Sequence, residues 1–192
     1  GSFTEMGLQR KLKKSLDEKW CMRFKTRHPE GDKYDGVVLH LTKEFVVLGA
    51  ECDFEFDGIH VFRRSAIKGY RDNKFDACCN QILSDNGQSK LFQVPSWLST
   101  FETFHQLASM LAERDIWPAV EAVFADGGSA LYIGPITEIK KNHFFLNCYD
   151  SAGKWEKEYR IDFNEVFRFE FGTKYTEHFN NYMRHQEESS GK

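Results

Sequence analysis

Hydrophobic and polar positions along the chain follow first a helical period and then a strand period. Leu8, Leu12 and Leu16 recur at every fourth position within a basic stretch, which predicts an amphipathic helix. Runs rich in β-branched and aromatic residues follow at 20–24, 34–41, 45–50, 59–62 and 67–71. The dipeptide Asp57-Gly58 predicts a turn between two of these runs. A second helix is predicted at 76–83.

The same order of elements recurs about one hundred residues later in the chain. Gly36 corresponds to Gly134, and Phe45 corresponds to Phe144. Strands of the second copy are predicted at 119–124, 130–139, 144–149, 154–163 and 166–171. A helical stripe over 101–111 precedes them, and a helix over 176–184 follows. We interpret this period as a duplication.

The repeat predicts two domains with short flanking segments. We expect residues 1–6 to be a tag remnant, 7–83 the first domain, 84–98 a linker, 99–186 the second domain, and 187–192 a disordered tail.

Composition agrees with a folded, β-rich chain. The 192 residues carry a net charge of -3 and are 41% hydrophobic, which excludes a disordered protein and a strongly basic nucleic-acid coat. Phenylalanine is unusually frequent, with eighteen copies. Many of them occupy repeated positions, such as Phe45 with Phe144 and Phe75 with Tyr175, so we expect these pairs in the core.

Cysteine usage suggests a reducing compartment. The five cysteines are an odd number, and no Cys-x-x-Cys motif occurs. We therefore expect a cytoplasmic protein whose thiols are mostly structural. No window reaches the roughly 20 apolar residues of a membrane span, and no signal peptide is recognisable, so no membrane partner is expected.

A helix followed by five short strands resembles the Sm-like (LSm) barrel, here in two tandem copies. Ile67-Lys68-Gly69 is similar to the Ile-Arg-Gly motif that leads into the last Sm strand. The run at 56–64, Phe-Asp-Gly-Ile-His-Val-Phe-Arg-Arg, is also similar to uncharacterised bacterial proteins with a duplicated barrel. The resemblance implies a mainly β fold with flanking helices: two tandem Sm-like, SH3-like five-stranded barrels, each preceded by a helix.

Sm-type RNA binders use an Asn after the second strand together with the Arg-Gly of the later motif. The first copy keeps Lys68 and Gly69 but has no Asn at 42–44, whereas the second has Asn142 but no equivalent Gly. Neither copy holds a complete pocket. Asn142 alternatively serves as an ordinary turn residue.

Basic residues are concentrated at 10–33, which indicates either a binding face for phosphates or a solvated helix face. The predicted RNA-binding residues are Lys11, Lys13, Lys14, Arg23, Lys25, Arg27, Lys68 and Asn142. The aromatic residues expected to stack on bases are Trp20, Phe24, Tyr34 and Tyr70.

An acidic segment at 51–57 has the opposite sign. Four acids alternate there with aromatic residues, as on a strand with one solvated side: Glu51, Asp53, Glu55 and Asp57. We predict these four as a surface for a basic partner protein.

No catalytic motif of the GxSxG, P-loop, GxGxxG or HExxH type occurs, so we predict no catalytic residue, metal or cofactor. Cys78 or Cys79 would be reactive only if a basic group lowered its pKa. The leading hypothesis is a non-enzymatic protein, regulatory or immunity-type, that binds another protein as a monomer or homodimer. The alternatives are a single-stranded RNA binder and a cryptic hydrolase; the latter requires a pocket with a titratable group of perturbed pKa.

Overall fold

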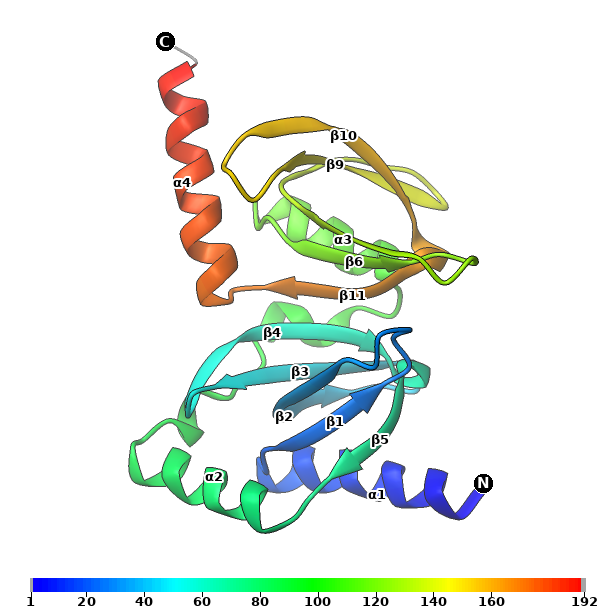
Figure 1. Cartoon of the computed structure of the whole chain (residues 1–192), viewed down its shortest axis with the longest axis vertical. Coiled ribbons are helices and arrows are strands. Elements are labelled where there is room, and N and C mark those ends of the chain that lie inside the picture. Colours follow the sequence, from blue (N-terminus) through cyan, green and yellow to red (C-terminus); the bar gives the residue numbers. More distant parts are fainter. Residues whose placement is uncertain (1, 191–192) are drawn as a thin grey trace. The chain divides into compact units, whose positions relative to one another are not determined.

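The computed structural model describes residues 2–190, and it is mainly β with flanking helices, as predicted (Figure 1). The chain divides into two compact units, Gly1–Ser99 and Thr100–Lys192. Each unit contains a helix, a set of antiparallel strands and a closing helix, in that order. The two copies inferred from the sequence therefore correspond to the two units.

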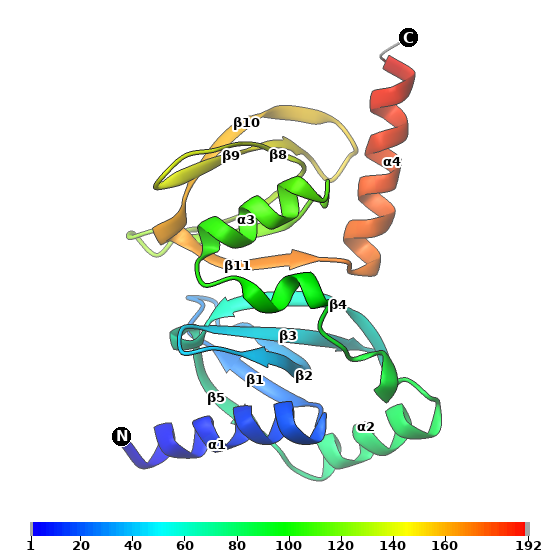
Figure 2. The ribbon, with the colours of Figure 1, turned by 180° about the vertical axis from the view of Figure 1, so that it is seen from behind.

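The strands of the first unit pair in the order β5-β1-β2-β3-β4. Its elements are α1 (Ser2–Glu18), β1 (Met22–Thr26), β2 (Lys33–Leu41), β3 (Phe45–Cys52), β4 (Glu55–Arg63), β5 (Ile67–Arg71) and α2 (Lys74–Asp85). In Figure 2 both helices lie at one end of these strands, and α1 contacts β2 and β5. The stripe of Leu8 and Leu12 is buried there, as the helical period requires.

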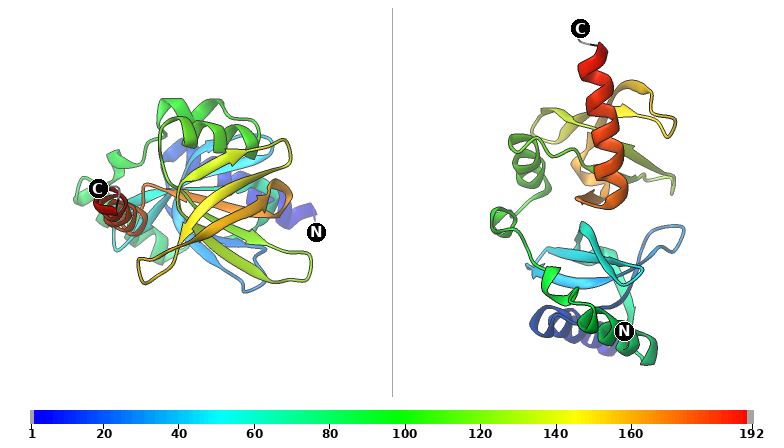
Figure 3. Two further views of the ribbon diagram at one scale, coloured as in Figure 1. Left: turned by 90° about the horizontal axis from the view of Figure 1, so that it is seen from above. Right: turned by 90° about the vertical axis from the view of Figure 1, so that its left-hand side faces the viewer.

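The second unit pairs its strands in two groups, β11-β6-β7 and β10-β9-β8. Its elements are α3 (Phe104–Glu113), β6 (Ala119–Val123), β7 (Ser129–Ile133), β8 (Ile136–Ile139), β9 (His143–Tyr149), β10 (Trp155–Asp162), β11 (Val166–Phe171) and α4 (Lys174–Ser190). Figure 3 shows α3 lying across these strands, whereas α4 stands beside them.

In each unit, an asparagine side chain of the closing helix hydrogen-bonds to the backbone just before the first strand. Asn80 Nδ2 donates to Cys21 O at 2.7 Å, and Asn80 Oδ1 accepts from Cys21 N at 2.8 Å. In the second unit, Asn180 Nδ2 donates to Trp117 O at 2.9 Å. These two asparagines are one hundred residues apart. The repeat thus includes a polar contact that the hydrophobic pattern does not reveal.

Two equivalent glycines let neighbouring strands approach closely. A Cβ at Gly36 would lie 2.3 Å from the carbonyl oxygen of Gly49 on β3, and one at Gly134 would lie 2.1 Å from that of Asn147 on β9. Both separations are far inside van der Waals contact, so only glycine fits at either position. The correspondence of Gly36 with Gly134 therefore has a steric cause.

The described strands do not close into barrels, contrary to the expectation from the sequence. No hydrogen-bonded ladder joins β4 to β5 among the described residues. The single strand expected at 130–139 is divided at Gly134 and Pro135 into β7 and β8, which belong to different groups. Pro135 has no N–H to donate to a ladder, which explains the interruption.

Many phenylalanines are buried in the core, but several aromatic residues are exposed. Phe45 and Phe144 are buried as predicted, and so are Phe24 and Phe62 of the first unit and Phe169 of the second. The second predicted pair is exposed, Phe75 by 61% and Tyr175 by 58%, because both lie in the first turn of a helix and not on a strand.

Several predicted boundaries also require correction. Asp57 and Gly58 lie inside β4, and the β3–β4 turn is instead formed by Asp53 and Phe54, whose φ angles are 48° and 66°. The predicted linker at 84–98 contains short 3-10 helices and the buried side chains of Phe92 and Leu98.

The predicted tag remnant and the predicted disordered tail lie mostly within helices. Helix α1 begins at Ser2, and α4 continues to Ser190, so residues 2–6 and 187–190 are helical. Residues 1, 191 and 192 lie outside the described part of the chain.

Replacing Gly36 tests the close approach of β2 to β3. We expect Gly36→Ala to lower the free energy of unfolding by about 3 kcal/mol, because the methyl group overlaps the carbonyl oxygen of Gly49. In Gly69→Ala the new methyl group would lie 3.7 Å from Lys25, so a change below about 1 kcal/mol is expected. Urea unfolding of the full chain measures both values, and equal effects would contradict the steric account.

Candidate functional site

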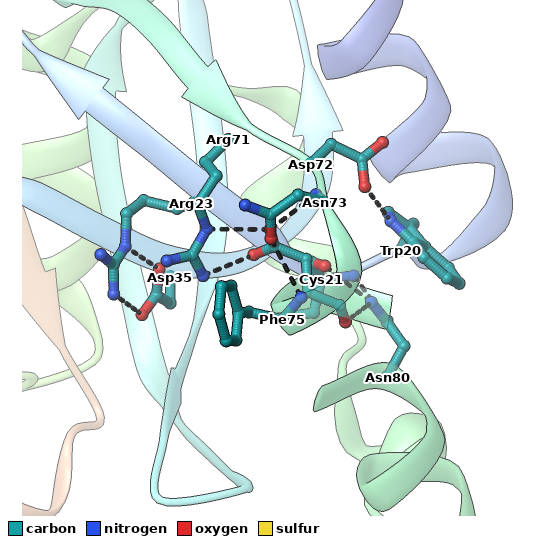
Figure 4. Close-up of polar contacts among 10 residues, drawn as sticks. Trp20, Cys21, Arg23, Asp35, Arg71, Asp72, Asn73, Phe75 and Asn80 are labelled. Atoms are coloured by element: carbon teal, nitrogen blue, oxygen red, sulfur yellow. Dashed lines mark hydrogen bonds and ion pairs between the residues drawn. The ribbon is translucent and has the colours of Figure 1, made fainter. Parts of the chain in front are cut away.

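The buried carboxylate of Asp72 neutralises much of the basic helix α1. Lys11 Nζ and Lys14 Nζ donate to Asp72 Oδ2 at 2.7 and 2.8 Å, and Trp20 Nε1 donates to Oδ1 at 2.9 Å, the last contact being visible in Figure 4. Burial alone would raise the pKa of Asp72, but the three donors outweigh it and lower the pKa to about 2. Lys11 and Lys14 therefore serve an internal contact.

Other basic residues predicted to bind RNA are also distributed among separate contacts. Lys13 Nζ lies 3.3 Å from Asp17 on the exposed side of α1. Arg23 donates from Nε and Nη2 to the two carboxylate oxygens of Asp35, at 2.8 and 3.1 Å (Figure 4). Lys25 is exposed on β1. The basic stretch at 10–33 therefore does not form a single binding face.

Asn142, the remaining nucleotide-binding candidate from the second copy, is an exposed residue of the second unit. It lies in the turn between β8 and β9, which is closed by the hydrogen bond from Lys140 N to His143 O at 2.8 Å. Its carbonyl oxygen accepts from Phe163 N at 3.0 Å. These backbone contacts agree with the alternative of an ordinary turn residue.

The aromatic residues predicted for base stacking are engaged within the first unit. Phe24 is buried, and Tyr34 meets Phe62 edge-to-face with ring centroids 4.9 Å apart. Lysines of α1 lie over the other two rings, 4.7 Å from the Trp20 centroid and 5.6 Å from the Tyr70 centroid. None of the four lines the groove described next.

A groove of about 1090 Å³ lies in the first unit, between α1, the end of β1 and the turns that flank β3 and β4. Five cations and one acid line it: Arg10, Arg27, Lys43, Arg64, Lys68 and Glu5. Hereafter we call this hollow the basic groove. Its strong charge asymmetry distinguishes it from the rest of a chain whose net charge is -3.

Two of the groove's cations are held in place and three extend into solvent. Arg64 donates to Gln9 Oε1 and, at 2.8 Å, to Thr42 O, and Arg27 Nε donates to Ser65 O at 3.1 Å. The other three are exposed and make no ion pair among the described residues: Arg10, Lys43 and Lys68. The groove therefore has guanidinium groups held by hydrogen bonds and exposed cationic side chains without an ion pair among the described residues.

Sequence reasoning identified only part of this groove. Arg27 and Lys68 were predicted as binding residues, but Lys43 and Arg64 were missed, as was Arg10 as a site residue. The signal in the sequence for a binding role was position. Lys43 lies in the turn after β2, and Lys68 lies at the start of β5. The β3–β4 register, which pairs Phe45 with Arg63, and the hydrogen bond from Arg64 N to Glu44 O bring those two segments together.

The four acids predicted as a partner surface do not form one surface. The β3–β4 register pairs Glu51 with Phe56 and Cys52 with Glu55. Because cross-strand partners share a face and successive residues alternate, Glu51 and Glu55 lie on opposite faces of the hairpin. Asp57 lies where the register between β3 and β4 shifts, and Asp53 is exposed in the turn.

A second hollow, of about 400 Å³, is lined by Cys21, Glu51 and Cys79 together with Asp35, Arg71 and Asp76. Arg71 donates to both carboxylate oxygens of Asp76 at 2.9 Å (Figure 4). Burial raises the pKa of Glu51 and of the Cys21 thiol, and burial with the charge of Glu51 raises that of Cys79 to about 11. No basic group lowers the pKa of Cys79, contrary to what a reactive thiol requires.

The sequence matches no family model, and neither the curated proteins nor the solved structures contain a match. In the described part of the chain, no helix has both the length and the apolar character needed to cross a membrane. The chemistry of the two hollows is therefore the basis for assigning a function.

The Asp72 contact predicts a specific dependence of stability on pH. A carboxyl group whose folded pKa is about 2 and whose ordinary value is 3.8 stabilises the fold above pH 3.8, and this contribution is lost as pH falls through 2. Between about pH 5 and pH 2 we expect the wild type to lose about 2 kcal/mol more than Asp72→Asn. Asp17→Asn, which removes an exposed acid, should follow the wild type; denaturant unfolding measures all three, and identical curves would contradict the assignment.

Proposed function

We propose that this protein is a non-enzymatic binding protein whose first unit captures an acidic segment of a partner protein. The basic groove carries this proposal, because five cations and a single acid line one hollow. This choice differs from the basic partner expected from the acidic segment at 51–57, whose acids lie on both faces of a hairpin.

Charge complementarity supports an anionic occupant. Arg64 and Arg27 are held by backbone carbonyl groups, so their guanidinium groups need no ordering when a carboxylate arrives. Lys43 and Lys68 belong to two different segments and line the same groove, so one occupant is able to contact both. A cleft with cations of one sign also raises the rate of encounter with an acidic partner.

The apolar part of the groove favours a protein segment over single-stranded RNA. Met6, Leu8 and Ile67 lie among the cations and offer contacts to aliphatic side chains of a peptide. Single-stranded RNA binding relies on aromatic residues that stack with bases, and among the described side chains no aromatic residue lines this groove. RNA is therefore the second candidate, and the test below distinguishes it.

Hydrolase chemistry receives no support from the second hollow. A thiol nucleophile reacts as the thiolate and needs a lowered pKa, whereas burial raises the pKa of Cys79 to about 11 and that of Cys21 as well. Among the described residues, no histidine lines this hollow. The raised pKa values therefore favour a different role for these thiols.

We also propose that each unit is an Sm-like unit. The support is the strand order of the first unit, β5-β1-β2-β3-β4 after a helix, and the equivalent glycines Gly36 and Gly134. The basic groove includes the turn after β2 and the start of β5, the two places from which Sm-type proteins take their ligand-binding residues. The cytoplasmic location remains part of this proposal, on the basis of the odd number of scattered cysteines.

A fluorescent acidic peptide, rich in Glu with two Leu residues, tests the groove on the full chain. We expect binding that weakens as salt rises, and at least about tenfold lower affinity in Lys43→Glu/Lys68→Glu, because two carboxylate partners are removed and repulsion is added. Fluorescence anisotropy at two salt concentrations measures this.

The matched control is Lys90→Glu, which reverses an exposed lysine outside the groove and should change affinity less than about twofold. Failure of the double variant to weaken binding would contradict the proposal. A single-stranded RNA oligonucleotide that binds more tightly than the peptide, and no longer binds the double variant, would also contradict the proposal. In that case the RNA alternative would replace the acidic segment.

A further inference from the structure

Two thiols and a carboxylate from three different elements meet in the smaller hollow of the first unit. Cys21 directly precedes β1, Glu51 lies near the end of β3, and Cys79 lies in α2. The sulfur atoms of the two cysteines and a carboxylate oxygen of Glu51 all lie within 4.8 Å of one another. Residues separated by 58 positions in the sequence thus present three donor atoms to one point.

Hydrogen bonds hold the three residues in this arrangement. Asn80, the residue after Cys79, bonds both the N–H and the carbonyl of Cys21, at 2.8 and 2.7 Å, so one side chain holds the backbone of Cys21 to the helix that contains Cys79 (Figure 4). Glu51 Oε1 accepts from Phe54 N at 2.9 Å, which orients its carboxylate. A preorganised donor set of this kind needs little reordering when an ion binds.

Acidic groups outnumber cations in the surroundings of the cluster. Acidic groups face it from β2, from the β3–β4 turn and from α2, namely Asp35, Asp53 and Asp76. Two cations oppose them, Arg23 and Arg71, and each is already bound to one of these acids. Burial and this local negative charge together raise the pKa values of Cys21 and Cys79. A bound divalent cation would supply the missing charge.

We propose that Cys21, Cys79 and Glu51 form a zinc-binding site. Two sulfur donors with one carboxylate oxygen suit Zn²⁺, whereas Mg²⁺ and Ca²⁺ prefer oxygen alone. Three protein ligands leave a fourth tetrahedral position for water or a ligand from the hollow of about 400 Å³. Binding converts both thiols to thiolates and releases their two protons to solvent, so affinity rises with pH.

The proposal is independent of the basic groove, since Cys21, Glu51 and Cys79 do not line it. It also differs from the prediction, made from the sequence, that the chain has no metal site. That prediction relied on the absence of a short-range motif such as HExxH. Here the ligands are brought together by the fold.

Zinc titration of the reduced full chain by calorimetry, with Co²⁺ as a spectroscopic probe, tests the site. We expect one Zn²⁺ per chain and a sulfur-to-cobalt charge-transfer band in the near ultraviolet. Cys79→Ser and Glu51→Gln should each weaken binding by at least about tenfold, and the first should reduce the cobalt band. Cys78→Ser is the matched control, because Cys78 is exposed and outside the cluster, and it should bind like the wild type.

Circular dichroism separates loss of ligand from loss of fold in each variant. If Cys79→Ser does not fold, Glu51→Gln decides, since it preserves the size of the side chain. Zinc should raise the melting temperature of the wild type but not of the ligand variants. Absence of zinc binding by the reduced wild type, equal binding by Glu51→Gln, or loss of binding in Cys78→Ser would each overturn the proposal.

Discussion

The close approach of β2 to β3 at Gly36 is the constraint on which the first unit depends. Met22, Gly36 and Ala50 form one row across β1, β2 and β3. Cys21 directly precedes Met22, and Glu51 directly follows Ala50. The row that contains Gly36 therefore lies beside the cluster of two thiols and one carboxylate. Because a Cβ at Gly36 would overlap the carbonyl oxygen of Gly49, the three strands keep this spacing only with glycine.

The second unit solves the same steric problem at Gly134, but with a different result. Pro135 follows the glycine and interrupts the strand, so the ladder is divided there. The duplicated glycines and asparagines maintain the common plan, whereas the residues around them differ. Cys21 at the Asn80 contact is replaced by Trp117 at the Asn180 contact. The two units therefore share the glycine and asparagine positions but differ in strand pairing and in the chemistry around them.

Charge in the first unit is organised by burial and not by position in the sequence. Asp72 is distant in the sequence from α1, yet its carboxylate accepts hydrogen bonds from two lysines of that helix and from an indole N–H. Such a carboxylate, only 7% exposed, requires several donors to remain ionised. The cations left over gather in the basic groove, from segments that are far apart in sequence. Counting charges along residues 10–33 therefore predicted a basic face at that stretch that does not form, and it missed the basic groove.

Much of the local structure was accessible from the sequence because it depends on short-range periodicity. The bounds of β5 and β11 were predicted correctly, as was the burial of Phe45 and Phe144. The β3–β4 turn was misplaced, since Asp53 and Phe54 adopt positive φ without glycine, supported by a hydrogen bond from Phe54 N to Glu51. A turn without glycine at its positions of positive φ lacks the usual sequence signal of a turn.

By itself, the sequence determined the duplicated order of elements, the mainly β character and the positions of its buried aromatic strands. Those features depend on side-chain alternation and on repeated residues, which are properties of a linear chain. Only the tertiary structure decided which cations pair internally, which line the basic groove, and that Cys21, Glu51 and Cys79 meet. These outcomes depend on strand order and register, which place residues side by side that the chain keeps far apart.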